Sequence, residues 1–350
     1  MHRLRRTLAC IAWLGLAGAS ASAQQQSGVL LTTTSASSGS QSPFHAYWIT
    51  HERDQVQIAE GMRLLVLRDD GWWEVGTTTL TQMNSQVHSQ EVWASPLGSP
   101  HARTRMIPLS DDDACPGDLS TYSVGWVASD FAAVHHDYES TCGGHPISGE
   151  ESFTVRLDDL RGSHLGSRLN LKHLKLSDVA GAEAVKAMAL GAEVANARAA
   201  QSVPEEKNNP PITTSDTAWI VIRRKGHYRL LGTTPIERGQ GGNTYDIPID
   251  PPKSLAGADE LAVGWDAILD QVPDAQDAYS SPDGDFLVVL APHYLSIFDL
   301  QQRTIGRRRM RMMIESPNVI AAQWATGINV QRWSETLLPL LKEAPYLPEK

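Results

Sequence analysis

Residues 64–78 read LLVLRDDGWWEVGTT, and residues 220–234 read IVIRRKGHYRLLGTT. In both stretches an apolar run passes through polar residues to a glycine, and an aromatic pair and a Gly-Thr-Thr sequence follow. An apolar strand, a polar turn with glycine and a second strand form the pattern of a β-hairpin. The two stretches therefore predict one hairpin near the start of each half of the chain.

Further pairs of short segments occur in the same order in the two halves. They are Val124-Gly125-Trp126 and Val263-Gly264-Trp265, Asp130-Phe131 and Asp285-Phe286, Asp159-Leu160 and Asp299-Leu300, and Ala189-Leu190-Gly191 and Ala325-Thr326-Gly327. Self-similarity in a constant order indicates an internal repeat. We interpret the chain as an internal duplication of one structural unit. The alternative is chance similarity between two β-rich domains.

The expected fold class is α+β and mainly β, with two tandem related domains. Each domain would be a hairpin plus further antiparallel strands, closed by a helix. Runs rich in Gln, Ser, Thr and Gly are typical of flexible segments, and runs rich in Pro, Asn and charge are typical of linkers. The predicted division is a signal peptide over 1–23, a flexible leader over 24–42, a first domain over 43–202, a linker over 203–217 and a second domain over 218–345.

The clearest helix is predicted over residues 179–200, which are alanine-rich with apolar residues near helical spacing. Ser177 is a candidate N-cap for it. The matching end of the second half, from Trp324 to Leu341, is expected to be helical and to be interrupted by Gly327 and Pro339.

The first 23 residues have the three parts of a secretory signal peptide. Arg3, Arg5 and Arg6 precede an apolar run, and Ala21-Ser22-Ala23 forms a cleavage site with small residues. The apolar run is shorter than the ~20 residues that span a bilayer, which disfavours a membrane anchor. We therefore expect a periplasmic or secreted protein with no transmembrane segment in the mature chain.

Removal of residues 1–23 takes the formal net charge from −10 to −13, because three arginines are lost. An acidic chain argues against nucleic acid as a partner. Cys115 and Cys142 are the cysteines of the mature chain, and an oxidising compartment predicts a disulfide between them. The alternative is two free thiols.

Several catalytic and cofactor motifs are missing from the sequence. It contains no His-Glu-x-x-His, Cys-x-x-Cys, Gly-x-Ser-x-Gly, phosphate loop or dinucleotide fingerprint. No cofactor is therefore expected. His136, Asp137 and His145 are the candidate metal ligands. Neighbouring residues on a strand point to opposite faces, so His136 would share a face with Tyr138 and not with His135 or Asp137. Solvated or disulfide-adjacent histidines are the favoured interpretation.

Charged clusters near the C-terminus provide candidates for partner binding. Arg307, Arg309 and Arg311 would lie on one face of a strand, with Arg308, Met310 and Met312 on the other. Three arginines on one face suit an anionic partner, and the alternative is an exposed face paired with the chain's own carboxylates. The carboxylates Asp274, Asp277, Asp283 and Asp285 are interpreted as solvated loop residues.

Tandem aromatics at Trp72-Trp73 and His227-Tyr228 sit on the two hairpins. Alternation turns one member of each pair inward and the other outward. We take Trp72 and Tyr228 as candidate docking residues. The alternative is aromatic packing within a β layer.

Two local resemblances add to this interpretation. Cys142-Gly143-Gly144-His145-Pro146 and the apolar residues that follow, within residues 131–170, resemble the extracytoplasmic domain of lysozyme-sensing anti-sigma factors and peptidoglycan deacetylases. That resemblance implies a non-catalytic module that binds the cell envelope. Ser281-Pro282-Asp283-Gly284 and the run 295–300 resemble one β-propeller blade, and a single such segment predicts no full propeller.

The sequence thus favours an exported binding protein for a protein or cell-envelope component, with an immunity-like, inhibitor-like or envelope accessory role. The alternative is a cell-envelope hydrolase that uses His135, His136 or His145 with nearby carboxylates. Convergent polar side chains in one pocket would favour an enzyme. A broad exposed patch, or a groove between the two halves, would favour a binding protein.

Overall fold

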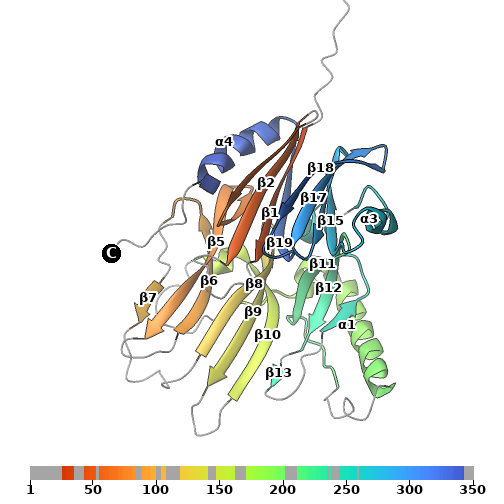
Figure 1. Cartoon of the computed structure of the whole chain (residues 1–350). Coiled ribbons are helices and arrows are strands. Elements are labelled where there is room, and N and C mark those ends of the chain that lie inside the picture. The colour runs from red at the N-terminus through yellow and green to blue at the C-terminus, as the bar shows by residue number, and fades with distance from the viewer. Residues whose placement is uncertain are drawn as a thin grey trace, which may run out of the picture.

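The computed structural model describes residues 26–34, 43–52, 55–82, 88–99, 104–107, 119–140, 147–161, 171–201, 211–234, 236–237, 244–257 and 260–342. In this part of the chain the protein is mainly β, as the composition and hairpin patterns predicted. Its strands form four sheets (Figure 1).

The first sheet joins the two ends of the described chain. Its strand order is β19-β1-β2-β3, with β1 at Gln26–Thr34, β2 at Phe44–Glu52, β3 at Gln55–Gly61 and β19 at Val319–Thr326. Leu30 of β1 lies opposite Gln323 of β19 on one side and Trp48 of β2 on the other. The prediction of a flexible leader over 24–42 is therefore wrong for residues 26–34, since β1 is a central strand whose apolar side chains are buried.

The largest sheet has eight strands and contains the first predicted hairpin. Its path is β13-β10-β9-β8-β6-β5-β4, with β7 paired to β5. The strands are β4 at Leu64–Arg68, β5 at Gly71–Gln82, β6 at His88–Pro96, β7 at Thr104–Ile107, β8 at Leu119–Val127, β9 at Phe131–Ser140, β10 at Ile147–Arg156 and β13 at Ile236–Glu237. β4 and β5 pair antiparallel, so that hairpin is confirmed. β6 and β8 meet in parallel at Gln90 and Thr121, which joins two antiparallel groups of strands.

The two remaining sheets come from the second half of the chain. One has the order β11-β12-β14, with β11 at Trp219–Arg224, β12 at His227–Thr233 and β14 at Thr244–Ile247. The other has the order β15-β16-β17-β18, with β15 at Asp277–Ser280, β16 at Phe286–Ala291, β17 at Tyr294–Gln301 and β18 at Thr304–Met313. The second predicted hairpin, β11–β12, is confirmed. Its two turn residues, Lys225 and Gly226, both have positive φ, as a two-residue hairpin turn requires.

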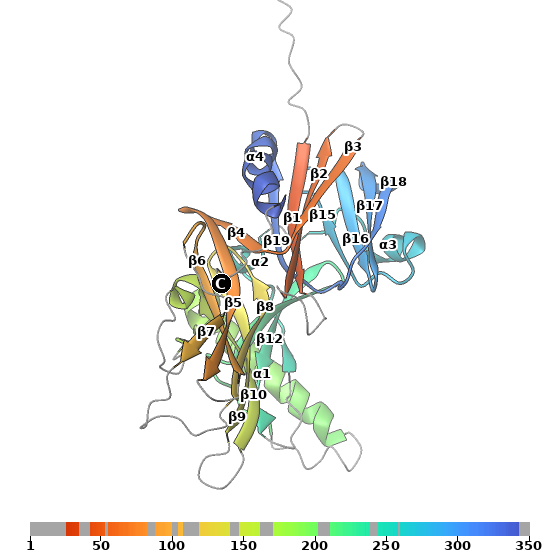
Figure 2. The same cartoon turned by 60° about the vertical axis from the view of Figure 1, so that its left-hand side comes forward.

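The sheets are arranged around a common centre in a propeller-like way, which Figures 1 and 2 show from two sides. The single blade-like segment predicted no full propeller, and the structure has a propeller-like arrangement of four sheets of unequal size. A small antiparallel sheet cannot bury both its faces alone, so several sheets of dissimilar sequence can pack around one centre. The pairing of β1 with β19 covers edges that each strand would otherwise expose.

The division into two tandem domains is not confirmed. One buried cluster combines Phe44 of β2, Val134 of β9 and Ile320 of β19, which lie on both sides of the predicted linker. β10 also pairs with β13 from the second half. Of the predicted linker, residues 211–217 are described, and there Asp216 accepts hydrogen bonds from the backbone N–H and the hydroxyl of Ser177.

The internal repeat is likewise not shown. Val124-Gly125-Trp126 lies within β8, whereas Val263-Gly264-Trp265 leads into a helix. Asp159-Leu160 lies in a 3₁₀ turn, and Asp299-Leu300 lies in β17. The two hairpins, β4–β5 and β11–β12, have in common that each is an antiparallel strand pair.

Four α-helices lie in the described part of the chain: α1 at Leu176–Gln201, α2 at Lys253–Ala256, α3 at Trp265–Gln271 and α4 at Ile328–Lys342. The helix predicted over 179–200 is confirmed as α1, although Gly181 is non-helical and kinks it near its start. The predicted C-terminal helix begins after Gly327 as α4, and Pro339 lies inside it. None of these helices is long and apolar enough to cross a membrane.

Candidate functional site

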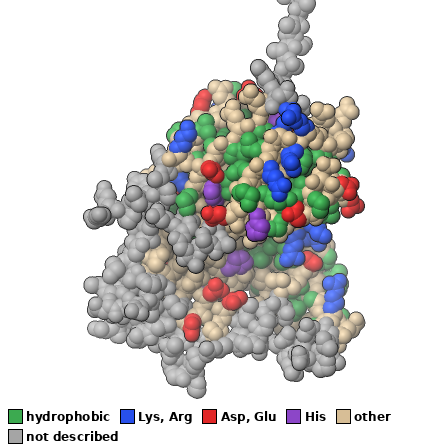
Figure 3. All heavy atoms as spheres, in the orientation of Figure 1, with side chains coloured by type: hydrophobic (Ala, Val, Ile, Leu, Met, Phe, Trp, Pro, Cys, Tyr) green, Lys and Arg blue, Asp and Glu red, His purple; other side chains and the backbone are tan. Residues whose placement is uncertain are grey.

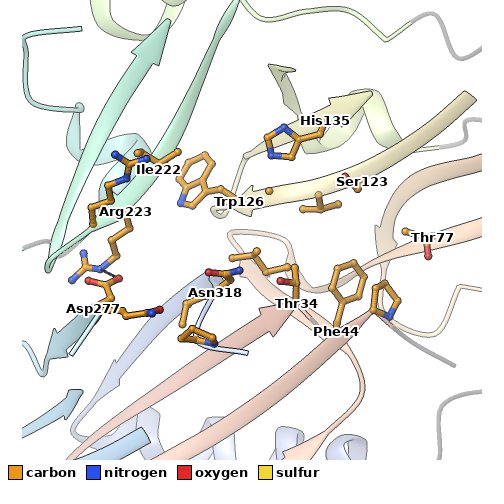
Figure 4. Close-up of a pocket in the computed structure, with 18 of the residues that line it drawn as sticks. Thr34, Phe44, Thr77, Ser123, Trp126, His135, Ile222, Arg223, Asp277 and Asn318 are labelled. Atoms are coloured by element: carbon orange, nitrogen blue, oxygen red, sulfur yellow. Dashed lines mark ion pairs between the residues drawn. The ribbon is translucent and has the colours of Figure 1, made fainter. Parts of the chain in front are cut away.

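A pocket of about 660 Å³ lies where the four sheets meet, and we call it the central pocket. The side chains that define it are Thr34, Phe44, Ser123, His135, Arg223 and Asn318. Figure 4 shows Trp126 and His135 across the space from Thr34, Phe44 and Asn318, with Arg223 and Asp277 at one side. This volume is within the range of pockets that bind small ligands.

The lining of the central pocket mixes neutral polar side chains with apolar ones, and the exposed Arg224 also lines it. Hydroxyl and amide groups come from Thr34, Thr77, Gln90, Ser123, Gln276 and Asn318. Phe44 and Trp126 are almost fully buried and contribute apolar surface. Such a lining supplies many hydrogen-bond donors and acceptors next to aromatic rings.

Arg223 and Asp277 form a buried ion pair at the wall of the central pocket. The Arg223 side chain is 4% exposed, and its Nε lies 3.2 Å from Asp277 Oδ2. Its Nη2 donates to the carbonyl of Ala278 at 2.7 Å. The guanidinium also lies 4.1 Å from the ring centroid of Tyr279. The opposite charges of the pair offset each other, so the pair does not demand a charged ligand.

Asp277 also ties the β11–β12 turn to β15. Asp277 Oδ1 accepts a hydrogen bond from the backbone N–H of Gly226 at 2.6 Å and another from the backbone N–H of Ala278 at 2.9 Å. Asp277 is buried and the Asp285 side chain is 9% exposed, so the interpretation of these two as solvated loop residues is wrong. The carboxylates are buried because charge partners on other strands reach them, which sequence spacing does not reveal.

His135 contributes an imidazole to the central pocket. Burial lowers the pKa of His135 below its usual value, which favours the neutral ring. Its Nδ1 lies 2.6 Å from Ser152 Oγ. The ring packs so closely on Gly125 that a Cβ there would lie 2.3 Å from Nε2. The glycine therefore leaves the room that this imidazole occupies.

A second pocket, of about 410 Å³, opens on the other side of Trp126 and is bordered by α2. Gln323 of β19 lies in its wall. The Gln323 carboxamide accepts from Leu67 N–H at 2.7 Å and donates to Leu67 C=O at 3.0 Å and to Ser129 Oγ at 3.1 Å. One side chain thus joins β19, β4 and the end of β8.

The candidate metal ligands do not converge. His136 contacts Ser120 and Glu151, and its ring lies 5.4 Å from that of Tyr138, so those two share a face as predicted. Asp137 is exposed. His145 lies outside the described residues, and within them no group of three or more His, Cys, Asp or Glu side chains is arranged to hold a metal ion.

The predicted arginine face lies on β18, the edge strand of its sheet. Figure 3 shows Lys and Arg side chains at the upper right of the molecule, where Figure 1 places β17 and β18. Arg309 binds the buried Asp299 through Nε at 2.7 Å, and the Arg311 guanidinium lies 3.6 Å from the ring centroid of Tyr294. Arg307 is exposed. Met310 and Met312 pack against the core, as alternation predicted.

The two aromatic docking candidates differ in burial. Trp72 is half-buried and packs edge-on against Trp333 of α4 at 5.2 Å. Tyr228 is 8% exposed and lies under Arg223, with 4.7 Å between the guanidinium carbon and the ring centroid. The assignment of Tyr228 to an exposed docking surface is wrong, because strand alternation turns His227 outward instead.

The predicted disulfide remains a prediction, since Cys115 and Cys142 lie outside the described residues. No protein-family model matches the chain, and no curated protein is significantly similar to it. The resemblance of residues 131–170 to the anti-sigma-factor and deacetylase domain therefore also stays a prediction.

Sequence reasoning missed Ser120, Glu151, Gln323 and the Arg223–Asp277 pair. Each of these residues acts through a partner on another strand, 15 or more positions away. The one usable signal is strand alternation: Tyr122, His136 and Glu151 occupy equivalent positions once β8, β9 and β10 are aligned.

Proposed function

We propose that this chain is an exported binding protein that holds a polar component of the cell envelope, of the glycan class, in the central pocket. The observation that carries the proposal is the convergence on one pocket of neutral hydroxyl and amide side chains from β1, β5, β6 and β8 and from the residues just before β15 and β19. The signal-peptide pattern of residues 1–23 supports a periplasmic or secreted location.

The chemistry of the pocket favours a neutral, hydroxyl-rich ligand. The opposite charges of its ion pair, Arg223–Asp277, offset each other, and its histidine is shifted towards the neutral form. Hydroxyl and amide side chains match the donors and acceptors of a sugar, and Trp126 and Phe44 give apolar surface to the ring faces. The resemblance to an envelope-binding domain, in residues 131–170, points to peptidoglycan fragments among such ligands.

Calorimetric titration of the mature chain with peptidoglycan disaccharide–peptide fragments tests the proposal, with stem peptides and neutral oligosaccharides as comparison ligands. Asn318 and Gln276 line the pocket and are exposed, so their substitution leaves the core intact. We expect Asn318→Trp to abolish binding by filling the mouth. The double change Asn318→Ala with Gln276→Ala should weaken binding by about 30-fold, since it removes two net hydrogen bonds of about 1 kcal/mol each.

Arg307→Ala is the matched control, because Arg307 is exposed on β18, away from the pocket. It should bind like the unchanged protein. Equal binding by Asn318→Trp would overturn the pocket assignment. If the glycan ligands do not bind and a protein is captured through the arginine face, with loss on Arg307→Ala, the inhibitor-like role would replace the glycan-binding one.

A further inference from the structure

Three side chains form a continuous hydrogen-bonded row on one face of the largest sheet. Ser120 of β8 lies 2.8 Å from His136 of β9, between Oγ and Nε2. His136 Nδ1 lies 2.9 Å from Glu151 Oε1 on β10. The order hydroxyl, imidazole, carboxylate is that of the triads that activate a serine nucleophile.

The strand register brings the three residues together. His136 pairs with Glu151 across β9 and β10, and with Tyr122 across β8 and β9. Ser120 is two residues before Tyr122, so it points to the same face. Directly opposed and diagonal neighbours on one face are within reach of each other's side chains.

The imidazole is held in one orientation. Tyr122 stacks flat on His136, with ring centroids 4.0 Å apart and an interplanar angle of 2°. The hydrogen bond from His136 holds the pKa of Glu151 below its usual value, so Glu151 is a carboxylate at neutral pH. A carboxylate only accepts, so Nδ1 carries the proton, and in the neutral ring Nε2 is left to accept from the Ser120 hydroxyl.

The row is partly exposed to solvent. The His136 side chain is 14% exposed and that of Glu151 is 32% exposed, and Ser120 is half-buried. None of the three lines the central pocket, so this site is separate from the proposed binding site.

We propose that Ser120, His136 and Glu151 form a serine-hydrolase site for carboxylic esters. Ser120 Oγ bonds to the ester carbonyl carbon as its proton passes to His136 Nε2. The ester C–O bond then breaks, and the departing alcohol takes that proton. Water attacks the acyl carbon and gives a proton to Nε2. The carbon–Oγ bond then breaks and Oγ takes that proton from Nε2, which releases the acid and restores both the serine and the neutral histidine.

The Ser120 backbone N–H donates to Ser89 Oγ at 3.3 Å, so this amide does not serve as an oxyanion donor. The absence of one such donor lowers turnover by about 10²–10³-fold in serine hydrolases. Covalent labelling is therefore the primary readout, and turnover of an activated ester is the second.

The sheet carries its own control pair on the opposite face. Ser152 Oγ lies 2.6 Å from His135 Nδ1, and in the described residues no carboxylate is hydrogen-bonded to that imidazole. Ser152 itself does not line the central pocket. The pair Ser152–His135 is therefore a serine–histidine contact that lacks the carboxylate of a triad.

The test is labelling of the mature chain with a fluorophosphonate probe, located by peptide mass spectrometry, and hydrolysis of p-nitrophenyl acetate. We expect the label on Ser120, its loss in Ser120→Ala and its retention in Ser152→Ala. Glu151→Gln should slow labelling by about 10-fold or more and flatten its pH profile, and Glu151→Asp should restore part of the rate, as expected for a positioning residue.

Circular dichroism melts confirm that each variant is folded. No label in the unchanged protein, or a label that persists in Ser120→Ala, would overturn the proposal. So would an equal loss in folded Ser152→Ala. Ligand binding in the central pocket is measured on Ser120→Ala, which separates the failure of this proposal from failure of the binding function.

Discussion

His51 lies in a buried polar network that joins β2 to the sheet of β15–β18. Its Nε2 lies 3.3 Å from Asp299 Oδ1, and its Nδ1 lies 3.4 Å from Asp285 Oδ2. Arg309 reaches Asp299 from β18. The network was invisible in the sequence, because the histidine and its acidic partners are more than 200 residues apart.

The Asp285 carboxylate, 3.4 Å from His51 Nδ1, raises the pKa of His51 above its usual value of 6.5, and burial opposes this effect. Its contribution to stability is therefore fully present below pH ~6.5, the unfolded value, and is lost as pH rises through the folded pKa. We expect the free energy of unfolding, measured by urea denaturation, to fall between pH 6 and 8 in the unchanged protein. The fall should be smaller in His51→Gln.

Asp285, which contacts His51, has a pKa shift in the opposite direction, so its contribution to stability depends on pH in the opposite way. Burial by itself would raise the pKa of Asp285, but the contacts with His51 and Ser281 together outweigh it and lower that pKa. The contribution of Asp285 to stability is therefore present above pH ~4 and is lost as pH falls through the folded pKa. An unfolding free energy of His51→Gln that fell as steeply above pH 6 as that of the unchanged protein would contradict the assignment of this titration to His51.

Gln323 is the second residue whose effect is set by partners on other strands. Gln323→Ala leaves the N–H and C=O of Leu67 without the carboxamide, which costs about 1–3 kcal/mol of unfolding free energy. The measurement is equilibrium denaturation. Gln331→Ala is the control, since Gln331 is exposed on α4 and bonds only Glu335 in the described contacts. Equally small losses of unfolding free energy in Gln323→Ala and Gln331→Ala would contradict the role of Gln323 in joining β19 to β4.

At the scale of the element, the position of helix α4 depends on the close contact between its backbone at Leu341 and Gly61 of β3. Val330, Leu337 and Leu341 are its buried side chains. A Cβ on Gly61 of β3 would lie 2.5 Å from the carbonyl oxygen of Leu341. The helix can rest on β3 only because residue 61 has no side chain.

Gly61→Ala should therefore displace the C-terminal turn of α4 and destabilise the protein by about 1–3 kcal/mol through overpacking. The measurement is thermal unfolding with tryptophan fluorescence, because Trp333 of α4 stacks near Trp48 and Trp72. Gly264→Ala is the matched control, since nothing lies within 4 Å of a Cβ there. A folded, spectrally unchanged Gly61→Ala would show that α4 is not held at that contact.

At the scale of the whole molecule, the pairing of β1 with β19 closes the arrangement. Val29, Leu30 and Leu31 are each at most 2% exposed, and burial of such side chains contributes about 1.5–3 kcal/mol each. Deletion of residues 24–34 should lower the melting temperature by more than about 10 °C or abolish cooperative unfolding.

A synthetic peptide of residues 24–36, added in trans, should restore part of the lost stability by refilling the place between β2 and β19. The same peptide with Leu30→Asp should not. Deletion without loss of stability would show that β1 is dispensable and would favour the tandem-domain division.

The sequence by itself determined the local elements. The hairpins β4–β5 and β11–β12 follow from apolar runs interrupted by glycine turns, and α1 from its alanine-rich helical spacing. The inward positions of Met310 and Met312 on β18 followed from alternation, whereas a register shift in the pairing with β17 places Arg308 opposite Phe298. These features depend on residues that are close together in the sequence, so local sequence patterns are enough to predict them.

Only the tertiary structure decided which strands are neighbours. The joining of β1 to β19, the ion pair Arg223–Asp277, and the row Ser120–His136–Glu151 all depend on packing between segments that are distant in sequence. Core burial selects those pairings, and many pairings of similar short strands satisfy the same local pattern. The central pocket exists because four such sheets meet, and no single segment of the chain encodes it.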